Sequence, residues 1–250
     1  MPYKFGYRVI GFSGEIKLSL INEALHTLLG FRLLMRFKAT LFDLDGTLLN
    51  TLDDLADTAN AALRQLQYQE HPVDSYRYFV GDGLRTLIER ILPESCMEKQ
   101  ISECEQVFKE LYAIHWADKS RPYPGVMAML GDLRGMGLML AILSNKPDEF
   151  TRMCVNRFFP ADTFSSVAGQ RAGIAKKPDP AGALIIAEKL GIRCDDVLYI
   201  GDTATDMQTG KRAGMRTAGV LWGFREIAEL EKNGADFIIS HPREIVKLCQ

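Results

Sequence analysis

The sequence predicts an α/β protein with a doubly wound parallel sheet and an inserted helical module. Short apolar runs alternate with helical patterns along most of the 250 residues, which is typical of parallel strands joined by right-handed crossovers. A gap of about 93 residues separates the first two runs, holds only helical patterns and is far longer than an ordinary crossover. The runs expected to form strands are Lys38–Leu44, Leu138–Leu143, Phe164–Ala168, Val197–Ile200 and Thr217–Leu221.

Two core helices have recognisable ends in the sequence. Asp179 and Pro180 precede an apolar periodic segment that stops at Gly191. This pattern predicts a helix with Asp179 as the N-cap, Pro180 at the first helical position and a glycine at its end. A second helix is predicted from Gly125 to Gly135. Helices of this kind join parallel strands.

The long gap predicts a helical module between residues 52 and 120. Apolar side chains recur at helical spacing from Leu52 to Leu66 and again from Met97 to His115. The segment Arg121–Gly125 then returns the chain to the sheet. We therefore expect residues 35–51 and 121–250 to form a Rossmann-like core, and residues 52–120 to form a helical cap.

Residues 1–34 precede this organisation. Leu18–Phe37 is rich in leucine but contains several polar and charged side chains, which makes it too polar for a membrane span. The region lacks the features of a secretory signal, whereas its basic, acid-poor composition leaves an organellar presequence open. Because Met35 stands directly before the first strand, we favour a natural start there, with residues 1–34 as an N-terminal extension. Leu25–Leu33 could instead form an amphipathic helix on the body.

Composition excludes several classes of partner. The chain has 30 basic and 32 acidic residues and no basic block, which argues against nucleic acid. No segment suits a membrane. The five cysteines are odd in number, widely spread and without a C-x-x-C pair, as expected for reduced thiols in the cytoplasm. We expect a monomer or a homodimer.

The most informative motif follows the first predicted strand and reads Asp43-Leu44-Asp45-Gly46-Thr47. Residues two apart in a strand point to the same side, so both aspartates are expected to face one site. Two close carboxylates resist joint ionisation, so the pair needs a cation or a proton. A carboxylate neutralised by a metal can attack an electrophile, and a protonated one can supply a proton. The alternative is a solvated turn before the next helix.

Polar groups also follow later strands. Ser144 and Asn145 come after Leu138–Leu143 and offer donors suited to a phosphate oxygen. Lys177 stands just before a predicted helix, where its ammonium could neutralise charge on a transferred group. The alternative is that Ser144 and Asn145 belong to an ordinary turn and that Lys177 is a solvated loop residue.

A second pair of carboxylates follows Val197–Ile200. Asp202 stands at the strand end and Asp206 lies one helical turn later, so both can face the same cavity. Magnesium prefers a few carboxylates with water and substrate oxygens. We expect a shell made by Asp43, the backbone carbonyl of Asp45 and Asp202, with Asp206 acting through water. The alternative is that Asp202 only caps the next helix.

Together, the D-x-D-G-T, S-N, K-P and G-D-x-x-x-D motifs resemble those of the haloacid dehalogenase (HAD) superfamily, from about Met35 to the C-terminus. The resemblance implies that Asp43 is a nucleophile that becomes an aspartyl-phosphate and that Asp45 is the general acid and base. An aspartate at position 45 favours phosphate esters over the substrates of dehalogenase or phosphonatase members. The resemblance further implies Mg²⁺ held by Asp43, Asp45, Asp202 and Asp206, and phosphate bound by Thr47, Ser144, Asn145 and Lys177.

A narrower resemblance is to phosphoglycolate phosphatases and related members with helical caps. It rests on Phe42–Leu49, Val80–Arg85, Tyr123–Val126 and Lys176–Pro180. It implies hydrolysis of a small phosphorylated metabolite, with 2-phosphoglycolate expected. A pyrophosphatase, a phosphosugar phosphatase or mutase, and a non-catalytic phosphate-binding regulatory protein remain alternatives.

The cap loop supplies the candidate specificity residues. Gly81, Asp82, Gly83 and Arg85 form this set, and Arg85 is expected to pair with a substrate carboxylate. The alternative is a helix start with Asp82 as its cap.

Overall fold

The computed structural model describes residues 36–250. The expectations for residues 1–34, for a start at Met35 and for a helix at 25–33 lie outside the described residues. Among the residues described, no helix is long and apolar enough to cross a bilayer.

A six-stranded parallel sheet forms the centre of the fold, in the order β5-β4-β1-β6-β7-β8. Strand β1 is buried throughout and lies between β4 and β6, with Phe42 in register with Ile142 and Ile200. The strand order reverses beside β1, and such switch points open a crevice at the carboxyl ends of the strands. The strands are β1 Ala39–Phe42, β4 Met139–Pro147, β5 Ser166–Gln170, β6 Val197–Gly201, β7 Arg216–Val220 and β8 Phe237–Ile239.

The five predicted strands and the fold class are confirmed, with two differences in detail. Strand β8 was not predicted, because its three residues are too few to show a pattern. Strand β4 continues past the apolar run to Pro147, so Ser144 and Asn145 are the last part of a strand rather than a turn after it.

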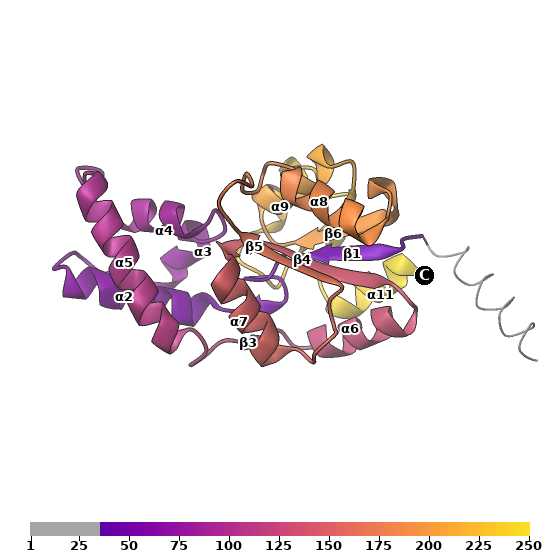
Figure 1. Ribbon diagram of the computed structural model, residues 1–250, viewed down its shortest axis with the longest axis horizontal. Helices are drawn as coiled ribbons and strands as arrows, with labels where there is room; N and C mark the ends of the chain where they lie inside the picture. Colours follow the sequence, from indigo (N-terminus) through magenta and orange to yellow (C-terminus); the bar gives the residue numbers. More distant parts are fainter. Residues whose placement is uncertain (1–35) are drawn as a thin grey trace, which may run out of the picture. The chain divides into compact units, whose positions relative to one another are not determined.

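Helices cover both faces of the sheet. Figure 1 shows α8 and α9 on one side of the strands and α6 and α11 on the other. On the α8 side, Ala183 and Ile186 pack against Leu41 of β1. The core helices are α6 Val126–Gly135, α7 Asp148–Phe158, α8 Ala181–Leu190, α9 Ala204–Arg212, α10 Ile227–Lys232 and α11 Pro242–Cys249.

Helix α8 begins one residue later than predicted. Pro180 occupies the N-cap position, and the carboxylate of Asp179 accepts a hydrogen bond of 2.8 Å from the backbone N–H of Ala181. Gly191 ends the helix in the left-handed conformation at φ 66°, as the sequence indicated.

We call residues 52–120 the helical segment. It leaves the core through β2 (Leu49–Asn50) and returns through β3 (Arg121–Pro122), which pair antiparallel. Its own apolar cluster includes Leu63, Ile88 and Phe108. It contains α2 Leu52–Gln65, α3 Tyr76–Phe79, α4 Leu84–Ile91 and α5 Glu98–His115, with a 3₁₀ turn at Val73–Ser75.

A buried carboxylate joins the two ends of the helical segment. Asp54, on the first turn of α2, accepts hydrogen bonds from the backbone N–H of Lys119 at 2.9 Å and of Ser120 at 2.7 Å. The Ser120 hydroxyl adds a third donor at 2.6 Å. We call β2, β3 and these contacts the neck.

Candidate active site

Asp43 follows the central strand β1 and faces a buried lysine. Its backbone N–H donates to the carbonyl of Ile200 at 2.9 Å, which fixes the chain at the strand end. The ammonium of Lys177 lies 2.9 Å from Asp43 Oδ1 and 2.7 Å from Asp206 Oδ1, and it also donates to the carbonyl of Leu143 at 3.2 Å. All three N–H groups of Lys177 therefore have partners.

Burial dominates the electrostatics at this end of the site. Burial raises the pKa of Asp43 well above its ordinary value, Lys177 opposes the change, and Asp206 and Asp202 add to it. For Lys177, burial alone would lower the pKa, but Asp206 and Asp43 outweigh it, and the net shift is upward. The lysine therefore stays charged, and its ammonium faces the carboxylates of Asp43 and Asp206.

The other two carboxylates are held by the turn after β6. Asp202 accepts hydrogen bonds from the Thr47 hydroxyl at 2.9 Å and from the backbone N–H of Phe224 at 2.8 Å. Asp206 accepts from the hydroxyl of Thr203 at 2.7 Å, within the capping box of α9. Burial, followed by the charge of Asp206, raises the pKa of Asp202 to about 7.

Three buried carboxylates form a group that fits a divalent cation. One oxygen each from Asp43, Asp202 and Asp206 lies within 4.8 Å of the others. Apart from its ion pair with Lys177, Asp43 Oδ1 has no hydrogen-bond partner among residues 36–250. Carboxylate oxygens are the donors that hard cations such as Mg²⁺ and Ca²⁺ prefer. A cation here would also relieve the like-charge repulsion that raises the carboxyl pKa values.

Two glycines make room for this group. Gly46 has φ +86°, and a Cβ atom on it would lie 2.3 Å from Asp202 Oδ2. A Cβ atom on Gly223 would lie 2.3 Å from the Cβ of Asp202. Position 46 thus needs glycine both for its backbone conformation and for the close approach of a carboxylate.

The side chain of Asp45 does not join the carboxylate group. Strand β1 ends at Phe42, so the alternation of a strand no longer relates Asp43 to Asp45. Asp45 accepts instead from the hydroxyl of Thr51 at 2.8 Å and from the ammonium of Lys146 at 3.1 and 3.2 Å. Both aspartates line the same cavity, as expected, but the carboxylates that chiefly raise the pKa of Asp43 are Asp206 and Asp202.

Of the four predicted phosphate-binding residues, Lys177 pairs with Asp43 and Ser144 lines the cavity with it, whereas Thr47 and Asn145 are engaged elsewhere. The hydroxyl of Thr47 donates to Asp202. The amide of Asn145 donates to the carbonyls of Gly81 and Lys177, both at 3.1 Å, and accepts from the N–H of Lys177 at 2.9 Å. Thr47 and Asn145 therefore hold other parts of the site in place rather than presenting free donors.

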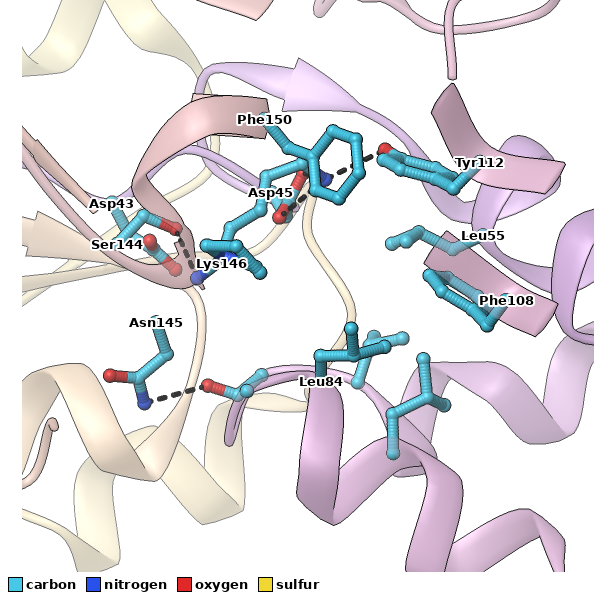
Figure 2. A pocket seen from close by; sticks show the side chains of 15 residues that line it. Asp43, Asp45, Leu55, Leu84, Phe108, Tyr112, Ser144, Asn145, Lys146 and Phe150 are labelled. Carbon is cyan, nitrogen blue, oxygen red and sulfur yellow. Dashed lines mark hydrogen bonds and ion pairs between the residues drawn. The ribbon is translucent and has the colours of Figure 1, made fainter. Parts of the chain in front are cut away.

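Lys146 is a site residue that the sequence reasoning missed. Its side chain is only 4% exposed, and its ammonium donates to Asp45 and, at 2.7 Å, to the Tyr112 hydroxyl on α5 (Figure 2). Burial alone would lower the pKa of Lys146, but Asp45 and Tyr112 outweigh it and keep the lysine charged. The signal available in the sequence was that Lys146 directly follows Asn145. Because β4 extends beyond its apolar run to Pro147, Lys146 is still part of the strand.

Asp43 and Asp45 open onto a cavity that encloses about 510 Å³ of space, part of which is open solvent. The residues that line it from the core are Asp43, Asp45, Ser144, Asn145 and Lys146 (Figure 2). Gly81 and Gly83 line it from the loop before α4. The remaining wall is apolar and includes Leu55, Val80, Leu84, Leu87, Phe108 and Phe150.

The structure does not bring Asp82 and Arg85 into the cavity. Asp82 accepts from the hydroxyl of Thr205 at 2.7 Å and does not cap α4, whose N-cap position is Gly83. Arg85 pairs with Glu89 at 2.8 Å and with Glu98 at 2.5 Å. Its guanidinium already has two carboxylate partners, so the expected role in binding a substrate carboxylate is wrong for this conformation.

The parallel sheet and the carboxylates at its switch point define an α/β protein whose site is built around Asp43 and a group of carboxylates that fits a divalent cation. Residues 40–220 match the family model of the haloacid dehalogenase-like hydrolases. The chain belongs to this family.

Individual relatives extend the match along most of the chain. The phosphoglycolate phosphatase of Aquifex aeolicus is 33% identical over 84% of this chain and 96% of its own length. The N-acetylmuramic acid 6-phosphate phosphatase of Pseudomonas aeruginosa is 34% identical over 85% and 94%. A solved structure of a predicted phosphoglycolate phosphatase from Haemophilus somnus superposes with a TM-score of 0.82 at 27% identity, covering 87% of this chain and all of that one.

Proposed function

We propose that this chain is a Mg²⁺-dependent phosphatase that hydrolyses a small phosphomonoester through an aspartyl-phosphate on Asp43, with 2-phosphoglycolate as its preferred substrate. The observation that supports this most strongly is Asp43 itself, which stands at the switch point of the sheet, lines the cavity and pairs with Lys177. The substrate follows from the relatives, several of which are phosphoglycolate phosphatases.

The first half of the reaction would transfer the phosphoryl group to the protein. The carboxylate of Asp43 attacks phosphorus, and a P–O bond forms as the bond to the leaving oxygen breaks. Lys177, 2.9 Å from Asp43, offsets charge on the transferred group, and the hydroxyl of Ser144 lines the same part of the cavity. Asp45 supplies a proton to the departing alkoxide.

The second half would release phosphate. Asp45, now ionised, takes a proton from a water molecule, which attacks phosphorus and frees the carboxylate of Asp43. Asp43, Asp202 and Asp206 would hold Mg²⁺, which supplies Lewis-acid neutralisation of phosphoryl oxygens. Residues 52–120 would act as the cap, because their apolar side chains wall the cavity and exclude water.

The direct test is a phosphate-release assay on a panel of substrates. The panel contains 2-phosphoglycolate, pyrophosphate, hexose phosphates, nucleotides and N-acetylmuramic acid 6-phosphate, the substrate named for one relative. We expect 2-phosphoglycolate to give the highest kcat/KM, EDTA to abolish turnover, Mg²⁺ to restore it and Ca²⁺ to inhibit it. An advantage of about tenfold or more for another substrate, or roughly 1.4 kcal/mol, would refute the substrate but not the phosphatase.

The same panel separates the remaining alternatives. A mutase would return the phosphoryl group to a sugar phosphate and release little inorganic phosphate. A non-catalytic phosphate-binding protein would release none from any member, even with Mg²⁺ present. We also propose that the protein works in the cytoplasm, which its five free cysteines support. A monomer or a homodimer remains the expectation for its assembly.

A further inference from the structure

The end of the cavity away from Asp43 contains a second buried lysine. The ammonium of Lys146 lies between the carboxylate of Asp45 on the core and the hydroxyl of Tyr112 on the helical segment (Figure 2). It also lies 4.7 Å from the centre of the Tyr112 ring. Among residues 36–250, Lys146 is the only cationic side chain that lines the cavity.

The hydrogen-bonding capacity of this pair is not used up. The two contacts from Lys146 to Asp45, at 3.1 and 3.2 Å, are long enough to share one N–H, and Tyr112 takes a second. One N–H of Lys146 therefore remains. The Tyr112 oxygen accepts from Lys146, so its own proton is free to donate. No acceptor for that proton is present among the described residues.

The surroundings of the pair determine what it can bind. Phe108 stacks on Tyr112 and Phe150 meets its ring edge to face at 5.0 Å, so the pair is closed in by aromatic side chains. An ammonium and a phenol in an apolar wall strongly favour an anion with two acceptor atoms, since each otherwise leaves a donor without a partner. A carboxylate meets this requirement.

We infer that Lys146 and Tyr112 bind a carboxylate on the leaving group, so that the site selects phosphate esters of small hydroxy acids. The inference rests on the proposed phosphatase, because it assigns Asp45 as the donor to the leaving oxygen. Lys146 contacts Asp45 directly, so a carboxylate held by Lys146 lies within a few bonds of an oxygen protonated by Asp45. A 2-hydroxy acid has this spacing.

The test compares two substrates of equal length, 2-phosphoglycolate and 2-hydroxyethyl phosphate, whose leaving group is neutral. We define discrimination as the ratio of their kcat/KM values. Lys146→Met keeps the length of the side chain without its charge and should lower discrimination by about 10- to 100-fold. Arg85→Met is the matched control, because it removes a cation that pairs with Glu89 and Glu98 outside the cavity, and discrimination should not change.

Tyr112→Phe gives a second, independent variant. It keeps the ring that packs against Phe108 and Phe150 and removes only the hydroxyl, and discrimination should fall by roughly 3- to 10-fold. Thermal unfolding identifies which variants are folded. An unchanged ratio in whichever of the two variants folds would overturn the inference.

The outcomes separate this inference from the proposed function. If both substrates lose rate equally in Lys146→Met, the lysine only holds Asp45, and the inference fails while the phosphatase stands. If another phosphorylated acid is the best wild-type substrate and Lys146→Met still lowers discrimination, 2-phosphoglycolate is wrong but the inference holds. A wild-type protein that hydrolyses no phosphate ester overturns both.

Discussion

The two buried lysines of the site differ in what surrounds them. Lys177 lies among groups from the core, where Asp43, Asp206 and the carbonyl of Leu143 occupy all three of its N–H groups. Lys146 faces one carboxylate from the core and one hydroxyl from the helical segment, within an apolar wall. The first lysine is part of a charge cluster, whereas the second retains a donor.

This difference separates the two tasks of the site. At the Asp43 end, three buried carboxyl groups lie close together, and a bound cation would offset their charge when a phosphate enters. At the Lys146 end, one ammonium faces Asp45 and Tyr112, and no cluster of carboxylates surrounds it. Loss of the metal should therefore disable the chemistry, whereas changes around Lys146 should alter the choice of substrate.

The largest expected effect is at the nucleophile. Asp43→Asn should lower kcat by at least about a thousandfold, because the covalent step is lost. The variant should fold, since it removes one of three crowded carboxylates. Asp132→Asn, on the exposed face of α6, is the control and should retain activity. Appreciable turnover by a pure Asp43→Asn preparation would show that another group attacks phosphorus.

A smaller loss, dependent on the leaving group, is expected at Asp45. Asp45→Asn should slow hydrolysis of 2-phosphoglycolate by about 10²- to 10⁴-fold, the usual contribution of a general acid. p-Nitrophenyl phosphate should lose less, because its leaving group departs without a proton. Steady-state rates on both substrates give the comparison, and equal losses would remove Asp45 from the role of proton donor.

Metal binding should depend on pH through Asp202. In the metal-free protein the pKa of Asp202 is raised from 3.8 to about 7, so the folded state keeps a proton that the unfolded state releases. In the metal-free protein, the contribution of Asp202 to the free energy of unfolding therefore falls as pH rises from about 4 to about 7. Because a cation needs the ionised carboxylate, Mg²⁺ should stabilise more at about pH 8 than at about pH 5.5.

Thermal unfolding with and without the metal measures this difference. At a hundredfold excess of Mg²⁺ over its Kd, the rise in Tm should be about 5–10 °C at the higher pH. Asp202→Asn should remove most of that rise. A shift that is the same at both pH values would indicate that the cation binds somewhere other than the carboxylate group.

The smallest expected effect is at Asn145, which links the loop at Gly81 to the backbone of Lys177. Asn145→Ala removes three hydrogen bonds to Gly81 and Lys177 and should lower the free energy of unfolding by about 1–3 kcal/mol. Urea unfolding measures the change, and Asn156→Ala, on the exposed surface of α7, is the control. Equal stabilities would show that the Gly81 loop is held by other contacts.

The sequence predicts the Asp43 end of the site better than the Lys146 end for a physical reason. Asp43 and Asp202 follow buried apolar strands, and the carboxyl ends of neighbouring parallel strands meet at one edge of a sheet. Their proximity therefore follows from the order of the strands. The turn at Gly46 is harder to predict, because it redirects Asp45 toward Lys146 once the strand has ended.

Contacts between the helical segment and the core depend on packing that no local pattern specifies. Lys146 was missed because its importance comes from Tyr112, which lies 34 positions earlier in the chain. Arg85 was assigned to the substrate because a sequence does not show which way the first turn of α4 faces or that Glu98 lies beside it. Thr47 was likewise assigned to phosphate, although its hydroxyl holds Asp202.

The neck has a consequence for how this protein can vary. Leu49 and Asn50 lie directly opposite Pro122 and Arg121, so the chain leaves and re-enters the core only one strand spacing apart. Asp54 fastens the same two stretches a few residues further on. Residues 52–120 therefore connect two adjacent points of the core, as the loop of a hairpin does. The entropic cost of closing a loop grows slowly with its length. Insertions, deletions or a wholly exchanged bundle are therefore tolerable there without any change in the strand that positions the nucleophile.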